Sequence, residues 1–126
     1  MAVPPGLTPE HLARFDHVPR ELVERVRFVQ VPFLTPGADA MTLGRTVLVR
    51  RGHGESLQLL AHELVHVQQW DRLGRVGFLR RYLGDYFRNL ARLRRHRAAY
   101  LAIPLEVEAR ERARRWHETD RHRDGD

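Results

Sequence analysis

The chain has 126 residues, 42% of them hydrophobic, which suits one domain with a modest core. It has no cysteine, so disulfides and thiolate ligands are excluded, and histidines and carboxylates remain as strong metal ligands. All 22 basic residues are arginine, and the formal net charge is +6. No apolar run approaches the ~20 residues of a membrane span, and no secretory signal is visible at the start. We therefore expect a cytoplasmic protein without a membrane span.

Short elements are expected in the first half of the chain. Residues 1–18 are predicted to form an N-terminal extension that includes a short helix from Pro9. Alternating apolar residues predict a strand over Arg25–Val31. A run of β-branched residues predicts another strand over Thr46–Arg50, after the segment Met41–Gly44. The sheet is therefore expected to have two or three strands.

The second half of the chain is predicted to be helical. Ser56 is suited to cap a helix over Leu57–Leu73, which a glycine follows directly. Apolar residues then recur at helical spacing over Phe78–Leu93, which favours a core-facing helix. Because its other side is basic, a membrane-surface helix is the alternative. A last helix is expected over Pro104–His117, and the polar tail 119–126 is expected to be frayed.

His62, Glu63 and His66 form an H-E-x-x-H sequence within the first of these helices. Residues four apart lie on one face, so the two histidines can direct their imidazoles at one metal ion. Glu63 is rotated by about 100° from His62 and can act as the base on a water molecule there. The flanking residues are apolar, so the helix is expected to be buried, and buried imidazoles need partners. Zinc (Zn2+) is the expected metal, and a pair of hydrogen-bonded core histidines is the alternative.

Glu106 and Glu108 are the best candidates for a third zinc ligand, which catalytic sites normally have. They are two positions apart, so their side chains leave the helix on nearly opposite sides. Glu108 shares its side mostly with charged residues. Glu106 shares its side with apolar residues, namely Ala102, Ile103, Ala109, Ala113 and Trp116. Because a buried carboxylate needs a cation, Glu106 is the predicted ligand and Glu108 the substitute. Alternatively, Glu106 pairs with a buried arginine such as Arg45 or Arg50.

Three segments, Thr42–Arg45, Ala61–Gln69 and Pro104–Ala109, together resemble small bacterial zinc metallopeptidase domains of the gluzincin type, including the minigluzincins. The resemblance implies an α+β, zincin-like fold in which a small sheet packs on about four helices. It also implies one minimal metallopeptidase domain spanning residues 1–126. Glu106 matches the first glutamate of the E-x-x-A-D helix of related zincins, which binds zinc.

Arg110 departs from that family pattern. It stands where the E-x-x-A-D helix has an aspartate, an acidic group of the kind that orients a zinc-binding histidine. Asp71, Asp85 or neighbours of Glu63 are the candidates to replace it.

The activity implied is hydrolysis of a peptide or protein substrate, with Glu63 as the general base. A further donor must stabilise the oxyanion. Tyr100 is the first candidate because it lies near Glu106 in the sequence, although an ordinary core tyrosine is the alternative. The other candidates are Tyr82, Tyr86 and His96. The strand Thr46–Arg50 is expected to serve as the template to which an extended substrate adds.

Nine arginines and one acidic residue lie between Arg72 and Arg97. The favoured interpretation is a solvated helix face on an arginine-biased chain, although nucleic acid, anionic lipid or an acidic partner could bind there. Two alternatives to a peptidase follow, a non-catalytic zinc-binding module and an arginine-rich nucleic-acid-associated protein. His53 is expected to be a loop residue.

Overall fold

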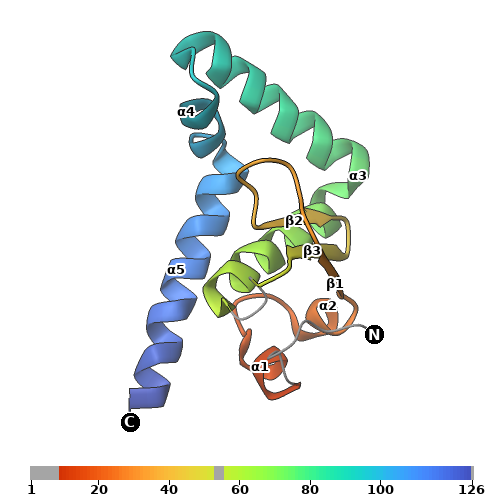
Figure 1. Cartoon of the computed structure of the whole chain (residues 1–126), viewed down its shortest axis with the longest axis vertical. Coiled ribbons are helices and arrows are strands. Elements are labelled where there is room, and N and C mark those ends of the chain that lie inside the picture. Colours follow the sequence, from red (N-terminus) through yellow and green to blue (C-terminus); the bar gives the residue numbers. More distant parts are fainter. Residues whose placement is uncertain (1–8, 53–55, 126) are drawn as a thin grey trace.

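The structure is a computed structural model and describes residues 9–52 and 56–125. These ranges form five helices and a three-stranded sheet (Figure 1), which confirms the expected α+β class. Residues 1–8, Asp126 and the segment that contains His53 lie outside the described residues. The elements are α1 (Pro9–Arg14), α2 (Arg20–Glu24), β1 (Arg27–Val31), β2 (Ala40–Leu43), β3 (Thr46–Arg50), α3 (Leu57–Leu93), α4 (His96–Leu101) and α5 (Pro104–Gly125).

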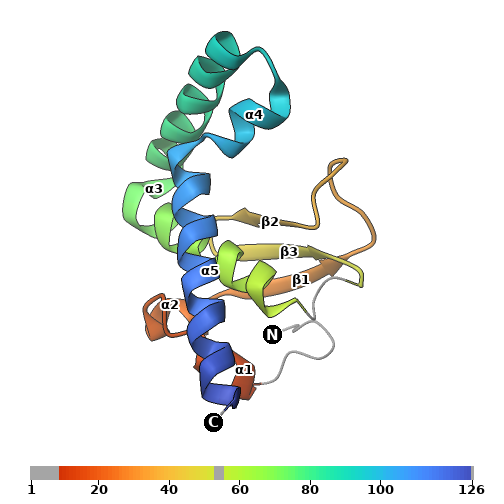
Figure 2. The same cartoon turned by 90° about the vertical axis from the view of Figure 1, so that its left-hand side faces the viewer.

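The sheet has the strand order β1-β3-β2, seen from the side in Figure 2. β1 runs parallel to β3, and β2 runs antiparallel to it. The expectation that Thr46–Arg50 would receive a substrate is therefore wrong, because the main-chain groups of β3 are already paired on both sides. Among the described residues, β2 is one of the two edge strands, and it contacts α3.

α3 consists of two helical segments joined at Gly74. This glycine has φ 76° and ψ 169°, a backbone conformation open essentially to glycine alone. We name Leu57–Leu73 the proximal segment and Arg75–Leu93 the distal segment. The helix that was expected to end near Leu73 does break there, at Gly74. A second helical segment then begins directly at Arg75. Ser56 caps the proximal segment as predicted, because its Oγ accepts a hydrogen bond from the Leu59 N–H at 3.3 Å.

The proximal segment lies at the centre of the main core. Five of its apolar side chains are at most 1% exposed: Leu60, Ala61, Leu64, Val65 and Val67. They pack with residues from the sheet and from α5, including Phe28, Val47, Val49, Ala109, Ala113 and Trp116. Since burying such side chains is the dominant favourable term in folding, this cluster fixes the position of the H-E-x-x-H sequence.

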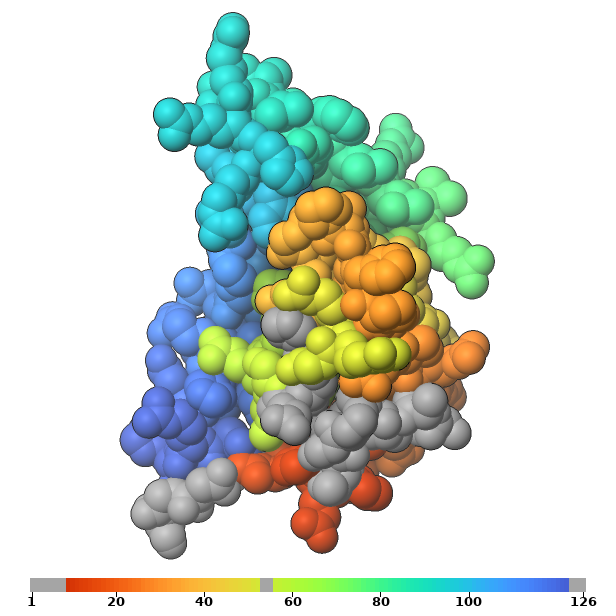
Figure 3. Space-filling model, viewed as in Figure 1, coloured from red at the N-terminus to blue at the C-terminus, as the bar shows by residue number. Residues whose placement is uncertain are grey.

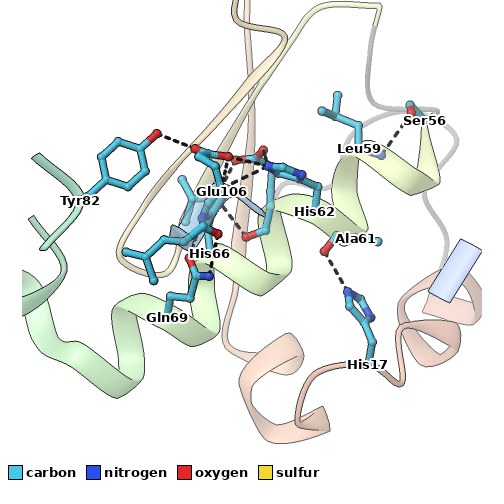
Figure 4. A network of polar contacts seen from close by, with 12 residues as sticks. His17, Ser56, Leu59, Ala61, His62, His66, Gln69, Tyr82 and Glu106 are labelled. Atoms are coloured by element: carbon cyan, nitrogen blue, oxygen red, sulfur yellow. Dashed lines mark hydrogen bonds and ion pairs between the residues drawn. The ribbon is translucent and has the colours of Figure 1, made fainter. Parts of the chain in front are cut away.

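Side chains between Pro9 and Val18 are part of this core, so this stretch is not an extension. Phe15 and Val18 are 2% and 6% exposed and belong to the main cluster. The Nε2 of His17 donates a hydrogen bond of 2.8 Å to the Ala61 carbonyl oxygen (Figure 4). Burial lowers the pKa of His17, only partly opposed by this hydrogen bond. The expectation for residues 1–18 is therefore wrong from Pro9 onward.

The C-terminal tail also differs from the expectation, since α5 continues to Gly125. Asp120 is 5% exposed and accepts two hydrogen bonds from Arg14, with Nε at 2.9 Å and Nη2 at 2.5 Å. This ion pair with two hydrogen bonds holds the C-terminal part of α5 against α1. A polar tail can thus be ordered by a distant charge, which an apolar pattern does not reveal.

The distal segment is only partly core-facing. Phe78 is buried, and Tyr82 and Tyr86 pack beside it on a second cluster with Trp70, Ile103 and Leu105. Other residues of the predicted apolar stripe are exposed, namely Leu79, Leu83 and Phe87. In the described ranges, no helix has both the length and the apolarity that crossing a bilayer requires.

Candidate metal centre

Three potential ligand atoms converge where the proximal segment meets the start of α5 (Figure 4). The Nε2 atoms of His62 and His66 are 3.2 Å apart, and each lies 3.1 Å from Oε1 of Glu106. Tetrahedral zinc with bonds of about 2.0–2.1 Å separates its ligand atoms by about 3.3 Å. The predicted set of two histidines and Glu106 therefore fits a zinc ion with only small adjustments.

Two helices hold this set in place. His62 and His66 lie one turn apart on α3, and Glu106 lies in the first turn of α5, which Pro104 begins. His66 is 5% exposed and Glu106 is 4% exposed. Little side-chain freedom remains, so the donor atoms are positioned in advance.

The surroundings of Glu106 favour its ionised form. Burial alone would raise the pKa of Glu106, but hydrogen bonds from His62 and His66 reverse this and hold it well below its usual value. Burial alone would lower the pKa of His66, but the Glu106 hydrogen bond and charge outweigh it and raise that pKa. The buried carboxylate is thus stabilised by positive or hydrogen-bonding groups, and a metal cation would supply the same stabilisation.

The alternative in which Glu106 pairs with a buried arginine is not what the structure contains. Arg45 is 3.4 Å from Asp71, and Arg50 is 2.6 Å from Asp39. Glu106 contacts the two histidines and Tyr82 instead.

Glu63 lies beside the histidines and is held from the sheet. The Oγ1 of Thr42, on β2, donates to Oε1 of Glu63 at 2.9 Å, and both residues are buried. Oε2 of Glu63 lies 3.9 Å from Nε2 of His62. The ligand atoms of His62, Glu63 and His66 all lie within 4.8 Å of one another, so Glu63 could also approach a cation. Glu63 lies farther from the Nε2 of His62 than Glu106 does, and Thr42 holds its other oxygen. Both facts favour Glu63 as a base over Glu63 as a third ligand.

Gln69 is a residue of the site that the sequence analysis missed. Its Nε2 faces two acceptors, the Leu105 carbonyl oxygen at 2.9 Å and Oε1 of Glu108 at 2.7 Å. The amide oxygen must therefore face His66, whose Nδ1 lies 2.8 Å away and must donate. In a neutral His66 the proton is then on Nδ1, and the lone pair of Nε2 is available to a metal. A glutamine three residues after the second histidine lies on the same helix face, which was the available signal.

Glu108 and Arg110 do not join the three converging atoms. Glu108 binds Gln69 and lies 3.9 Å from Arg72, so its part is to hold the amide that orients His66. Arg110, in place of the family's aspartate, donates to the Leu101 carbonyl oxygen at 2.6 Å. The two proposed replacements are engaged elsewhere, because Asp71 pairs with Arg45 and Asp85 pairs with Arg88.

Two tyrosines approach Glu106. The hydroxyl of Tyr82 donates to Oε2 of Glu106 at 2.5 Å, and Figure 4 shows the ring directed at the carboxylate. Tyr100 is 38% exposed, and burial together with the charge of Glu106 raises its pKa. It therefore keeps its proton at neutral pH and can donate a hydrogen bond. The other two candidates bind each other, since the Tyr86 hydroxyl lies 2.7 Å from Nδ1 of His96.

A family model described as the eCIS core domain matches residues 30–74, less than half of the chain. The match covers the last two residues of β1, all of β2 and β3, and the proximal segment of α3. It contains the H-E-x-x-H sequence, Thr42 and Gln69, but it ends before Glu106. No curated protein and no solved structure matched the chain.

Proposed function

We propose that the protein is a zinc-dependent metallopeptidase of the endopeptidase type. His62, His66 and Glu106 would hold the zinc ion, and Glu63 would be the general base. The observation that carries the proposal is the convergence of two imidazole nitrogens and one carboxylate oxygen at 3.1–3.2 Å, next to a separately held glutamate.

A bound zinc ion would act as a Lewis acid on the substrate carbonyl and would lower the pKa of a water molecule. The residues of the chain supply the rest. Oε2 of Glu63 accepts the water proton and passes it to the leaving amine, while Thr42 holds the other oxygen. The hydroxyl of Tyr100 donates to the developing oxyanion of the substrate. An extended substrate would add to the open edge of β2, which carries Thr42 to the site.

The family match gives this proposal a biological setting. The eCIS core domain is a domain in extracellular contractile injection systems. We infer that the peptidase acts together with such a system on a peptide or protein substrate. Co-sedimentation of the chain with purified injection particles tests this inference, and a chain that remains in the supernatant would count against it.

A non-catalytic zinc module is the second candidate. Structural zinc sites are normally closed by four protein ligands. Here the fourth nearby group is Glu63, and its hydrogen bond to Thr42 holds it back from the three converging atoms. This difference favours an open site with room for water and substrate.

The test compares the wild-type protein with Glu63→Gln. Elemental analysis should find about one zinc per chain in both proteins, because Glu63 is not a ligand. Hydrolysis of a quenched fluorescent peptide library should fall by about 10²–10⁴-fold in the variant. A wild-type protein that takes up no zinc would overturn the proposal. Zinc uptake without hydrolysis by the wild type would indicate the non-catalytic module.

A further inference from the structure

The distal segment of α3 and α4 form a hairpin at one end of the molecule (Figures 1 and 2). Its outer side carries uncovered apolar side chains. Four residues at helical spacing make one stripe, with exposed fractions of 77% for Val76, 44% for Leu79, 46% for Leu83 and 60% for Phe87. We name these four residues the distal stripe. The adjoining side of the segment, with Phe78, Tyr82 and Tyr86, packs on the second cluster, and the stripe beside it remains exposed to a partner.

The same hairpin is strongly basic. All nine arginines between Arg72 and Arg97 are exposed. Arg88 pairs with Asp85 at 2.9 Å, and Arg72 lies 3.9 Å from Glu108. Among the described residues the other seven have no acidic partner: Arg75, Arg80, Arg81, Arg92, Arg94, Arg95 and Arg97. The space-filling view in Figure 3 shows this end of the molecule extending beyond the sheet.

The arrangement of charge around the stripe is that of an interfacial helix. At 100° per residue, Arg75 and Arg80 fall on opposite borders of the distal stripe. Arg81, Arg88 and Arg92 lie on the side that faces away from it. Long arginine side chains can place their guanidinium groups at lipid headgroups while their stems lie against apolar surface. Apolar residues on one side and arginines at the border and on the polar side are typical of helices that lie in a bilayer surface.

We propose that this hairpin binds peripherally to a bilayer that contains anionic phospholipid. The distal stripe would enter the boundary between headgroups and acyl chains, and the bordering arginines would bind lipid phosphates. The two features together favour this partner. Nucleic acid would account for the arginines but not for four exposed apolar side chains. A second copy would bring two strongly positive surfaces together.

The proposal is independent of the peptidase chemistry but has a consequence for it. Tyr82 lies on the packed side of the same segment and donates to Glu106. A hairpin seated on lipid would therefore hold the candidate metal centre close to the bilayer surface.

Vesicle co-sedimentation tests the proposal, using phosphatidylcholine vesicles with and without phosphatidylglycerol. Wild type should bind only the anionic vesicles. Phe87→Glu and Leu83→Glu should each weaken binding by about tenfold or more, because each replaces an exposed apolar side chain that would enter the bilayer with a charged one. Phe33→Glu is the matched control, since Phe33 is 78% exposed but lies outside the hairpin, and it should bind as wild type does. Circular dichroism would establish that all variants are folded.

The charges have a test of their own. Arg75→Gln with Arg80→Gln should weaken binding to the anionic vesicles, whereas Arg25→Gln with Arg27→Gln, two exposed arginines elsewhere, should not. Equal binding to neutral and anionic vesicles, or equal loss in Phe33→Glu and Phe87→Glu, would overturn the proposal. Failure to bind vesicles together with salt-dependent retention of duplex DNA would identify nucleic acid as the partner instead.

Discussion

The two segments of α3 share one helix but have opposite surroundings. The proximal segment is enclosed by the sheet, α5 and side chains between Phe15 and Val23, and most of its apolar side chains are buried. The distal segment packs on one side only and exposes both apolar and basic residues. Gly74, at the kink, is the point of change. Sequence period alone describes both segments as helical, so it is the number of covering elements that separates their roles.

The difference also determines what polar groups do in each segment. In the proximal segment, His62, His66 and Gln69 each have a partner, because unpaired polar groups in a dry interior are costly. Within the part of the chain that the structure describes, most arginines of the distal segment have no acidic partner, because water solvates them. In both segments these polar groups have hydrogen-bonding partners. The partners are protein groups at the candidate metal centre and water at the hairpin.

A pair of matched truncations should give the largest contrast in stability. Leu60→Ala, at a side chain that is 0% exposed, should lower the free energy of unfolding by about 2–5 kcal/mol because it leaves a cavity. Leu83→Ala, at 46% exposure, should lower it by less than about 1 kcal/mol. Chemical denaturation measures both. If both variants lost the same free energy of unfolding, the distal stripe would have to be covered in solution, and the two segments would not differ in their surroundings.

The next effect concerns metal affinity. Gln69→Met removes the acceptor that orients His66 and should weaken zinc binding by about 10–100-fold, measured by competition with a chromophoric chelator. Gln68→Met, the same change at the neighbouring position, should leave the affinity unchanged.

A double variant separates orientation from simple damage at this position. Gln69→Glu combined with Glu108→Gln restores an acceptor for His66 and a donor–acceptor pair between the two side chains. Zinc affinity should return to within about tenfold of the wild-type value. If the double variant is as weak as Gln69→Met, then Gln69 does not act by orienting His66.

The kink offers a contrast in which the two effects have opposite signs. Gly74→Ala should lower the free energy of unfolding by roughly 1–3 kcal/mol, because φ 76° with ψ 169° is strained for any residue with a Cβ. Gly84→Ala, at an ordinary helical position with no atom within 4 Å of the added Cβ, should raise it by up to about 1 kcal/mol. Thermal unfolding compares them. A neutral Gly74→Ala would show that α3 can straighten without loss.

Local signals in the sequence predicted the elements well. The cap at Ser56, the break at Gly74, the strand Thr46–Arg50 and the start at Pro104 are all confirmed. The strand order was not predictable, because it depends on pairing between distant segments. The same holds for the ordered tail, where Arg14 and Asp120 are 106 positions apart.

The candidate site also has a part that the sequence predicted and a part that it did not. The helical spacing and the apolar neighbours of Glu106 correctly predicted the side chains that converge. Thr42 and Gln69 were missed, although strand alternation and the i, i+3 rule place both on buried faces. Threonine and glutamine are not usual metal ligands. A search for ligands alone therefore misses Thr42, which holds Glu63, and Gln69, which orients His66.

The central claim is that Glu106, and not Glu108, completes a zinc site with the two histidines. The most direct test is the zinc dissociation constant of wild type, Glu106→Ala and Glu108→Ala, measured by chelator competition. The geometry predicts tight binding by wild type, loss of stoichiometric zinc in Glu106→Ala, and a smaller change in Glu108→Ala that acts only through Gln69. Equal affinity of Glu106→Ala and wild type, or a larger loss in Glu108→Ala, would contradict it.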